Sequence, residues 1–155
     1  MQHGEALAKD VDPERGLSAE GQDHVRVAAR ALSNLGTSIT GICSSPKKRA
    51  IQTAQAVAEA FLLPDSALRV MEVLEPLVPP EEAVEALKPL GLEGALLLAG
   101  HLPSLAEICA YIMDCQSKIA FRMSGVGCLR VEQWGRGGGT LLWYLAPEHL
   151  AKIAE

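Results

Sequence analysis

Short apolar runs alternate with longer amphipathic stretches along this chain, and that alternation constrains the fold more than any other feature. The run ALLLA at 95–99 has no polar residue, which is typical of a strand buried on both faces of a parallel sheet. The stretch PKKRAIQTAQAVAEAF at 46–61 has helical spacing, and Pro46 lies near its first turn, where a missing N–H costs least. We therefore expect an α/β fold of three layers, in which helices cover both faces of a mostly parallel sheet.

The other elements continue this alternation. Ser18 can cap a helix that Gly36 ends, and Gly91 follows the end of another helix that starts at Pro80. Two strands near the carboxyl end are expected to pair across the glycine-rich turn at 135–139. The expected strands are 38–45, 67–73, 95–100, 126–134 and 139–146, and the expected helices are 18–36, 46–61, 80–90, 104–113 and 147–154.

Composition narrows the class of protein. With 155 residues, 48% of them hydrophobic and 21% charged, the chain suits one soluble globular domain over 1–155. A net charge of −5 without a Lys/Arg block argues against nucleic acid or an anionic membrane as partner. No basic segment precedes an apolar run, and the longest apolar runs are far too short to span a bilayer, so we expect a cytoplasmic protein. The four cysteines show no CxxC spacing and are expected to be reduced core thiols: Cys43, Cys109, Cys115 and Cys128.

Polar residues gather where the expected strands give way to helices or turns. These places are HGE at 3–5, SSPKKRAIQTA at 44–54 and GHLP at 100–103. In α/β sheets, ligands bind at the carboxyl ends of the strands, where helix N-termini present free N–H groups. Arg49 offers a guanidinium fork for phosphate oxygens, and an imidazole such as His3 or His101 is a capable nucleophile toward phosphorus. Each residue alone also has a plainer explanation: His3 as a disordered terminal residue, His101 as a structural histidine and Arg49 as an exposed helix residue.

Taken together and in this order, the three motifs resemble the signatures of the histidine phosphatase superfamily, which includes the phosphoglycerate mutases. The short chain, the DPERGLS segment soon after the first motif and the lack of a large insertion before GHLP resemble the SixA-type phosphohistidine phosphatases within it. The resemblance implies a phosphoglycerate mutase-like fold, with His3 as nucleophile and Arg49 and His101 holding the phosphoryl group. It implies substrate-binding roles for three further residues: Gln2, Gly4 and Arg15. No third ligand accompanies His3 and His101 as a metal site needs, so we expect no metal, and we expect no cofactor.

The implied reaction has two steps, with phospho-His3 as the intermediate that water hydrolyses. A departing alkoxide needs a proton from a positioned acid, whereas an imidazole has a pKa near 6.5 and leaves far more easily. Glu72 and Glu75 are the nearest candidate acids, with solvated surface residues as the plainer alternative. We therefore expect a phosphatase acting on phosphohistidine of a signalling phosphotransfer protein. A small-molecule phosphatase of the same fold and a weakened or non-catalytic phosphoryl-binding module remain alternatives.

The chain departs from the family pattern in two places. Gln2 stands where most members have an arginine, which removes a charge and, at about 1–2 kcal/mol, would slow the reaction roughly 5–30-fold. Family members also place an apolar strand before the first motif, and here only two residues precede His3. The first strand is therefore expected to be missing. A start that lies upstream, another segment or chain in its place, or poor folding and inactivity would each account for this.

Overall fold

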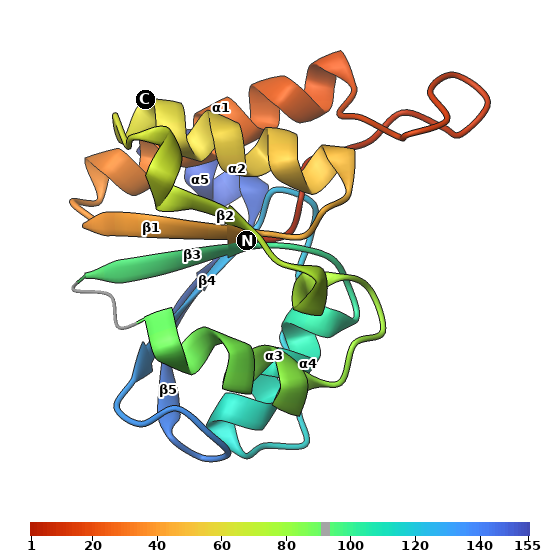
Figure 1. Ribbon diagram of the computed structural model, residues 1–155. Coiled ribbons are helices and arrows are strands. Elements are labelled where there is room, and N and C mark those ends of the chain that lie inside the picture. The colour runs from red at the N-terminus through yellow and green to blue at the C-terminus, as the bar shows by residue number, and fades with distance from the viewer. Residues whose placement is uncertain (91–93) are drawn as a thin grey trace.

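The structure is a computed structural model that describes residues 1–90 and 94–155. It contains a parallel sheet of order β2-β1-β3 and an antiparallel hairpin of β4 and β5 (Figure 1). The strands are β1 (Ile39–Ser44), β2 (Leu68–Val70), β3 (Ala95–Ala99), β4 (Val126–Val131) and β5 (Gly139–Leu145). The helices are α1 (Ala19–Asn34), α2 (Lys48–Ala60), α3 (Pro80–Leu87), α4 (Ser104–Met113) and α5 (Pro147–Ile153), with short 3-10 turns at Asp65–Ala67, Glu72–Leu74 and Lys88–Leu90.

Helices cover both faces of the parallel sheet, as the sequence predicts. In Figure 1, α1, α2 and α5 lie on one side of β1 and β3, and α3 and α4 lie on the other. Successive side chains of β1 point to opposite faces of the sheet, so β1 contributes to the hydrophobic core on each side. Ile42 packs with the first group of helices and Cys43 with the second. The finer expectation of one mostly parallel sheet needs correction, since the strands divide into a parallel sheet and a separate antiparallel pair.

Several local predictions can be compared with the structure. The Ser18 hydroxyl accepts from the Gly21 N–H at 3.0 Å and caps α1, and Gly36 takes a positive φ of 69° just after its end. The expected strand 67–73 is shorter, because a 3-10 turn replaces its second half. Helix α2 begins at Lys48, so Pro46 lies in the preceding turn and not in the helix. Gly91 lies outside the described residues.

The cysteines are free thiols, and their locations differ. Burial raises the pKa of Cys43 and of Cys109 to about 11, so both thiols stay protonated at neutral pH. Cys115 is exposed just after α4, so the expectation that all four are core residues is wrong for this one. In the described parts of the chain, no helix has the length and apolar character needed to cross a membrane.

The first three residues form backbone hydrogen bonds to the end of β3 and to the residue before β4. The Met1 amino group donates to the Leu98 carbonyl at 2.8 Å, and the His3 N–H donates to the Gly100 carbonyl at 3.1 Å. On the other side, the Gln2 N–H donates to the Gly125 carbonyl at 3.1 Å. Among the described residues no strand precedes β1. These three residues nevertheless connect the end of β3 to the start of β4, and their backbone bonds position His3.

Candidate active site

The three sequence motifs meet at one edge of the parallel sheet. β1 and β3 are parallel neighbours, so the segments that follow them, with Arg49 and His101, emerge side by side. His3 joins them through its backbone bond to Gly100. The structure thus brings His3, Arg49 and His101 together, with the two imidazole centroids 4.9 Å apart.

His3 is held by both ring nitrogens and is only 8% exposed. The Arg49 Nε–H donates to its Nε2 at 3.1 Å. Because Nε2 accepts, the proton of the neutral ring lies on Nδ1, which donates to the Gly4 carbonyl at 2.6 Å. This arrangement directs the Nε2 lone pair into the cluster.

His101 has the opposite tautomer. Arg49 has no acceptor, so its Nη2 donates to Nδ1 of His101 at 3.4 Å. The proton of the neutral ring is therefore on Nε2, which donates to the Ser45 hydroxyl at 2.9 Å. One guanidinium thus contacts both imidazoles through two different nitrogens.

Burial and neighbouring cations keep both imidazoles neutral. Burial lowers the pKa of His101 to about 3, and His3, Arg49 and Lys47 add to this decrease. The pKa of His3 is also lowered, first by burial and then by Arg49 and Arg15, against the opposing effect of its bond to the Gly4 carbonyl. At neutral pH, His3 therefore presents an unprotonated Nε2, and Arg49 carries the positive charge of the cluster.

Two residues on the neighbouring elements fix this arrangement. The Thr53 hydroxyl, one helical turn after Arg49, donates to the Arg49 carbonyl at 2.8 Å and accepts from the Gly4 N–H at 3.2 Å. A Cβ on Gly4 would lie 2.7 Å from the Gly21 carbonyl oxygen and from Val25 Cγ2, so only glycine fits there. Gly4 thus orients His3 through its carbonyl, and its suggested contact with substrate stays a prediction.

The Gln2 side chain is buried and contacts carbonyl groups. With its nitrogen turned toward them, its amide donates to the Phe121 carbonyl at 3.3 Å and to the Arg122 carbonyl at 3.2 Å. These bonds anchor the amino terminus to the segment before β4. A role of Gln2 in binding substrate stays a prediction.

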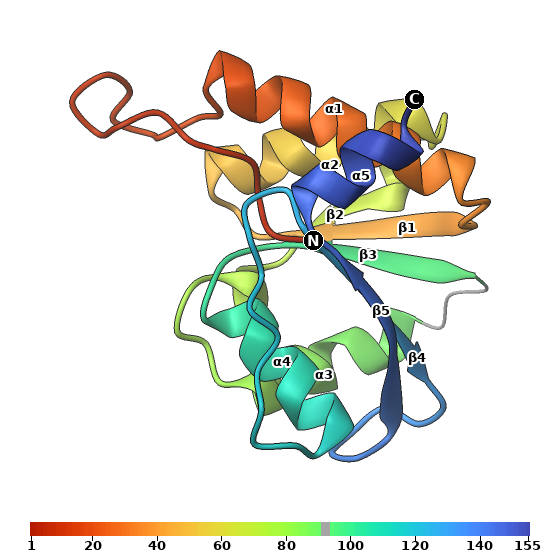
Figure 2. The ribbon, with the colours of Figure 1, turned by 180° about the vertical axis from the view of Figure 1, so that it is seen from behind.

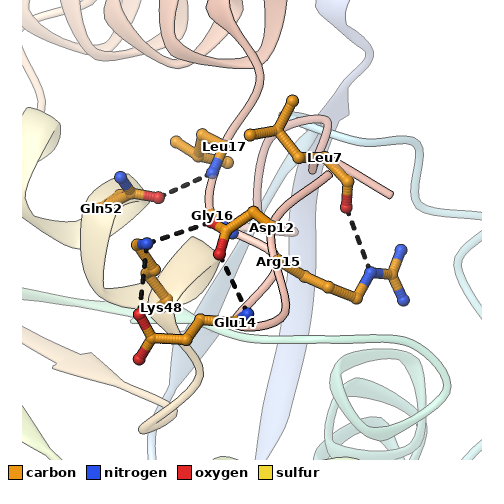
Figure 3. Close-up of polar contacts among 8 residues, drawn as sticks. All are labelled: Leu7, Asp12, Glu14, Arg15, Gly16, Leu17, Lys48 and Gln52. Carbon is orange, nitrogen blue, oxygen red and sulfur yellow. Dashed lines mark hydrogen bonds and ion pairs between the residues drawn. The ribbon is translucent and has the colours of Figure 1, made fainter. Parts of the chain in front are cut away.

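Arg15 lies in a loop that projects from the body of the protein between the first motif and α1 (Figure 2). Its Nε donates to the Leu7 carbonyl at 3.3 Å, and its side chain points away from Lys48 (Figure 3). Among the described residues it makes no hydrogen bond to the His3, Arg49 and His101 cluster. Its charge is nevertheless close enough to lower the pKa of both His3 and Arg49.

The base of this loop is tied to α2. Lys48 Nζ lies 3.0 Å from an Asp12 carboxylate oxygen and 3.3 Å from one of Glu14, and the Asp12 carboxylate also accepts from the Gly16 N–H at 2.9 Å (Figure 3). Gln52 accepts from the Leu17 N–H at 2.7 Å. The helix that carries Arg49 thereby holds the loop that carries Arg15.

The candidate acids differ in their surroundings. Glu72 is exposed, as the plainer alternative expects. Glu75 is half-buried, and its carboxylate accepts from Lys47 Nζ at 2.8 Å. Lys47 in turn lies close enough to His101 to lower its pKa. A carboxylate is thus near the cluster, but it is engaged as the acceptor of an ion pair.

Sequence reasoning missed two residues that support the cluster, Ser45 and Thr53. Thr53 had a detectable signal, since it lies four positions after Arg49 on one helix face. The signal for Ser45 was weaker, because a serine before a proline at a strand end is common in turns. The sequence suggested that one lysine of the KK pair faces the phosphate, with Lys47 as a cation that could compensate for Gln2. Lys47 approaches His101, whereas Lys48 faces the loop.

Comparison with known proteins identifies the family. The model of the histidine phosphatase superfamily (branch 1) matches residues 2–73. The phosphohistidine phosphatase SixA of Escherichia coli strain K12 is 30% identical over 162 residues, which cover 100% of this chain and 96% of that protein. The chain belongs to the histidine phosphatase superfamily. Within it, the chain is a full-length homologue of SixA, which confirms the resemblance found in the sequence.

Solved structures of superfamily members show how far the likeness extends. The protein histidine phosphatase SixA in complex with tungstate has a TM-score of 0.87 and 26% identity, over 97% of this chain and 96% of that one. A phosphoserine phosphatase of Entamoeba histolytica, in complex with phosphoserine, has a TM-score of 0.72 and 14% identity, over 96% of each chain. The second comparison shows a shared fold only, so the fold by itself does not select among phosphorylated substrates.

Proposed function

We propose that residues 1–155 form a single catalytic domain that removes the phosphoryl group from phosphohistidine on a signalling phosphotransfer protein. The observation that carries this proposal is the state of His3. Its Nδ1–H is held by the Gly4 carbonyl, and its unprotonated Nε2 faces the Arg49 Nε–H at 3.1 Å. A nucleophile for phosphorus needs an unprotonated nitrogen beside a cation that can hold phosphoryl oxygens, and this pair supplies both once Arg49 turns toward the substrate.

In the first step, Nε2 of His3 forms a bond to phosphorus while the bond between phosphorus and the substrate imidazole nitrogen breaks. The leaving imidazole keeps the electron pair of that bond and takes a proton from solvent. The Arg49 guanidinium turns from the two imidazoles to the phosphoryl oxygens, where charge accumulates. Water then attacks phospho-His3, which releases inorganic phosphate and restores the neutral ring.

His101 is proposed to change its protonation state during the reaction. In the structure its Nδ1 accepts a hydrogen bond, so it has no proton there to offer a phosphoryl oxygen. A nearby phosphoryl dianion favours the charged imidazolium and raises the pKa of the ring. His101 then takes up a proton on Nδ1 as substrate binds, and donates it as a hydrogen bond to the phosphoryl group.

The choice of phosphohistidine over a phosphate ester rests on the candidate acid. Glu75 accepts from Lys47 at 2.8 Å, and this ion pair leaves it poorly arranged to donate a proton to an alkoxide. The 30% identity to a phosphohistidine phosphatase supports the same choice. A small-molecule phosphatase of the same fold is the second candidate, because Glu75 pairs with Lys47, which itself lies near His101, and its carboxyl is free to act as the acid when that ion pair opens.

The test compares turnover of phosphoramidate, a phosphohistidine-bearing phosphotransfer protein and a simple alkyl phosphate. We expect the first two to exceed the alkyl phosphate at least about tenfold, since imidazole and ammonia need less help in leaving. His3→Ala should abolish all three activities, and His149→Ala, which changes an exposed histidine on α5, should leave them unchanged. Comparable turnover of the alkyl phosphate, lost in Glu75→Gln, would favour the small-molecule phosphatase. Absence of any acid-labile phosphoenzyme would favour the binding module.

A further inference from the structure

Lys47 and Glu75 form an ion pair beside the cluster of His3, Arg49 and His101, and the reaction proposed above assigns no step to Lys47. Lys47 Nζ lies 2.8 Å from a Glu75 carboxylate oxygen. The Lys47 side chain is 42% exposed and that of Glu75 is 35% exposed, so solvent and small ions reach both groups. An ion pair in such a partly exposed place contributes little to stability, so it can exchange partners at low cost.

The backbone of Lys47 is fixed close to His101 through one hydroxyl group. Ser45 Oγ accepts from the Lys47 N–H at 3.3 Å and from the Nε2–H of His101 at 2.9 Å. Lys47 lies directly before α2 and two residues before Arg49. Its ammonium is close enough to His101 to lower the pKa of that imidazole. The segment that carries Arg49 therefore also brings a second cation to the cluster.

Glu75 is fixed to the helix that follows His101. Ser104, the first residue of α4, is buried; its hydroxyl donates to the Glu75 carbonyl at 3.2 Å and accepts from the Leu77 N–H at 3.0 Å. The His101 carbonyl accepts from the Leu105 N–H at 2.9 Å, so His101 and Ser104 belong to the same turn. The two residues of the ion pair are thus anchored on either side of His101, one through Ser45 and the other through Ser104.

The free cluster carries less positive charge than a phosphoryl group calls for. Both imidazoles are neutral, so Arg49 supplies the positive charge, and Gln2 adds none. A phosphoryl group at neutral pH carries nearly two negative charges. A proton taken up by His101 offsets part of this difference, and a nearby cation offsets more. Lys47 is such a cation, but in the free chain its charge is balanced by Glu75.

Two other cations near the cluster are less suited to this task. Lys48 is held by two carboxylates, those of Asp12 and Glu14, at 3.0 and 3.3 Å. Arg15 lies in the projecting loop, where its Nε donates to a carbonyl of the same loop at 3.3 Å. Among the described residues Lys47 pairs with a single carboxylate, and one phosphoryl oxygen is enough to replace it.

From the ion pair, its two anchors and the charge of the cluster, we propose that Lys47 is a further substrate-binding residue and that the phosphoryl group displaces Glu75 from it. As substrate enters, Lys47 Nζ turns from the carboxylate to a phosphoryl oxygen beside His101. The ammonium exchanges one anionic oxygen for another, so it keeps a charged acceptor throughout. Glu75 turns to solvent, to which it is already partly exposed. Glu75 thereby competes with the phosphoryl group and sets how tightly the site holds it.

The identity of the anion rests on the proposed function, whereas the exchange of partners can be measured without turnover. The exchange also separates the two roles of Glu75, as a competing anion and as an acid. Its carboxylate leaves Lys47 as an anion, so it serves as the acid of the second candidate function only after it takes up a proton. Removal of its charge should therefore strengthen anion binding whichever phosphorylated substrate the protein uses.

Binding of tungstate and of inorganic phosphate, measured by calorimetric titration in about 0.15 M salt, gives a direct test. Glu75→Gln frees Lys47 and should bind both anions at least about twofold more tightly, because no ion pair has to open. Lys47→Met removes the cation at similar side-chain length and should bind both at least about fivefold more weakly, because a charge-assisted contact is lost. Lys47→Arg keeps the charge and should stay within about twofold of the parent.

Matched controls separate the ion pair from a general change in charge. Glu72→Gln makes the same change in net charge at an exposed carboxylate of the same segment, and it should stay within about 1.5-fold of the parent because salt screens distant charges. In the background of Lys47→Met, Glu75→Gln should change the affinity less than about 1.5-fold, since no ammonium is left for Glu75 to occupy. In turnover of phosphoramidate, Lys47→Met should raise KM by about the factor measured for binding and leave kcat within about twofold.

Several results would overturn the inference. Unchanged or weaker tungstate binding by Glu75→Gln would show that the carboxylate does not compete with the anion. Parental affinity in Lys47→Met would show that the ammonium does not bind the anion, and an equal gain from Glu75→Gln with and without Lys47 would reduce the effect to net charge. Absence of tungstate and phosphate binding by the parent chain would overturn it as well.

The binding test and the proposed function can fail separately. A parent chain that shows the expected changes in binding but no turnover would refute the phosphatase activity and leave the exchange of partners intact. Turnover with unchanged binding in both variants would do the reverse. Thermal unfolding shows whether each variant is folded, and Lys47→Gln and Glu75→Ala take the place of any variant that is not.

Discussion

Replacing Arg49 by lysine separates the shape of the guanidinium from its charge. Arg49 contacts His3 through Nε at 3.1 Å and His101 through Nη2 at 3.4 Å, so one rigid group spans both imidazoles. A lysine at this position keeps a positive charge but concentrates it on one nitrogen, which cannot reproduce two donors at fixed spacing. Arg49→Lys therefore loses at least one charge-assisted hydrogen bond to the phosphoryl group.

The expected size of the effect follows from that one bond. A hydrogen bond to a charged group contributes about 1.5–3 kcal/mol. Each 1.36 kcal/mol corresponds to a factor of ten, so phosphoenzyme formation should slow by about 10–150-fold in Arg49→Lys. Arg49→Ala loses the charge as well and should be slower still.

The assay is single-turnover labelling with phosphoramidate, followed by rapid quenching in alkali and quantification of phosphohistidine. Lys48→Ala is the matched control, since it removes the adjacent cation on the same helix, whose ammonium pairs with Asp12 and Glu14 and not with either imidazole in the part of the chain that the structure describes. It should label within about threefold of the parent, because surface ion pairs contribute little. Thermal unfolding shows whether each variant is folded. Labelling of a folded Arg49→Lys at the parent rate would refute the role of the guanidinium fork.

Three other perturbations probe the same cluster. The pKa of His101 is about 3 in the folded chain and about 6.5 when unfolded, so the unfolded state binds more protons between these pH values. The free energy of unfolding should therefore fall as pH drops from about 6.5 toward 3, by up to about 1.4 kcal/mol per pH unit from this residue. Denaturant titrations in which His101→Gln shows the same dependence of this free energy on pH would contradict this. Ser45→Ala leaves the buried Nε2–H of His101 without its acceptor and should lower the free energy of unfolding by about 1–3 kcal/mol in urea titrations, whereas an unchanged midpoint would show that this bond is not formed. Gln2→Arg should raise phosphatase activity about 5–30-fold in steady-state assays, and no gain would mean that the site is adapted to glutamine.

The fold could largely be predicted from periodicity and capping, because both are local. The apolar run at 95–99 is β3, and Ser18 and Gly36 bound α1 as expected. The division of the strands into two sheets could not be derived in the same way. It depends on whether backbone edges of β3 and β4 find a partner, and that is a contact between segments about 30 residues apart.

The positions of site residues could be predicted where a motif marks the end of a strand. The direction of a side chain within a motif could be predicted less well. His3, Arg49 and His101 meet because adjacent parallel strands end at one edge. Arg15 and Gln2 belong to the same motifs, but one side chain bonds to the Leu7 carbonyl and the other to carbonyls before β4. The direction of each side chain depends on which hydrogen-bond acceptor lies nearest, and the sequence alone does not show where that acceptor is. The catalytic roles of the three central residues remain proposals.

The central claim is that the phosphoryl group passes through Nε2 of His3, and the most direct measurement is to locate it. The chain is trapped with phosphoramidate, digested under alkaline conditions and analysed by mass spectrometry and phosphorus NMR, which distinguish the two nitrogens of phosphohistidine. The account predicts phosphate on Nε2 of His3, because Nδ1 is occupied by its bond to the Gly4 carbonyl at 2.6 Å. Phosphate on Nδ1 of His3, on His101 or on no residue at all would contradict it.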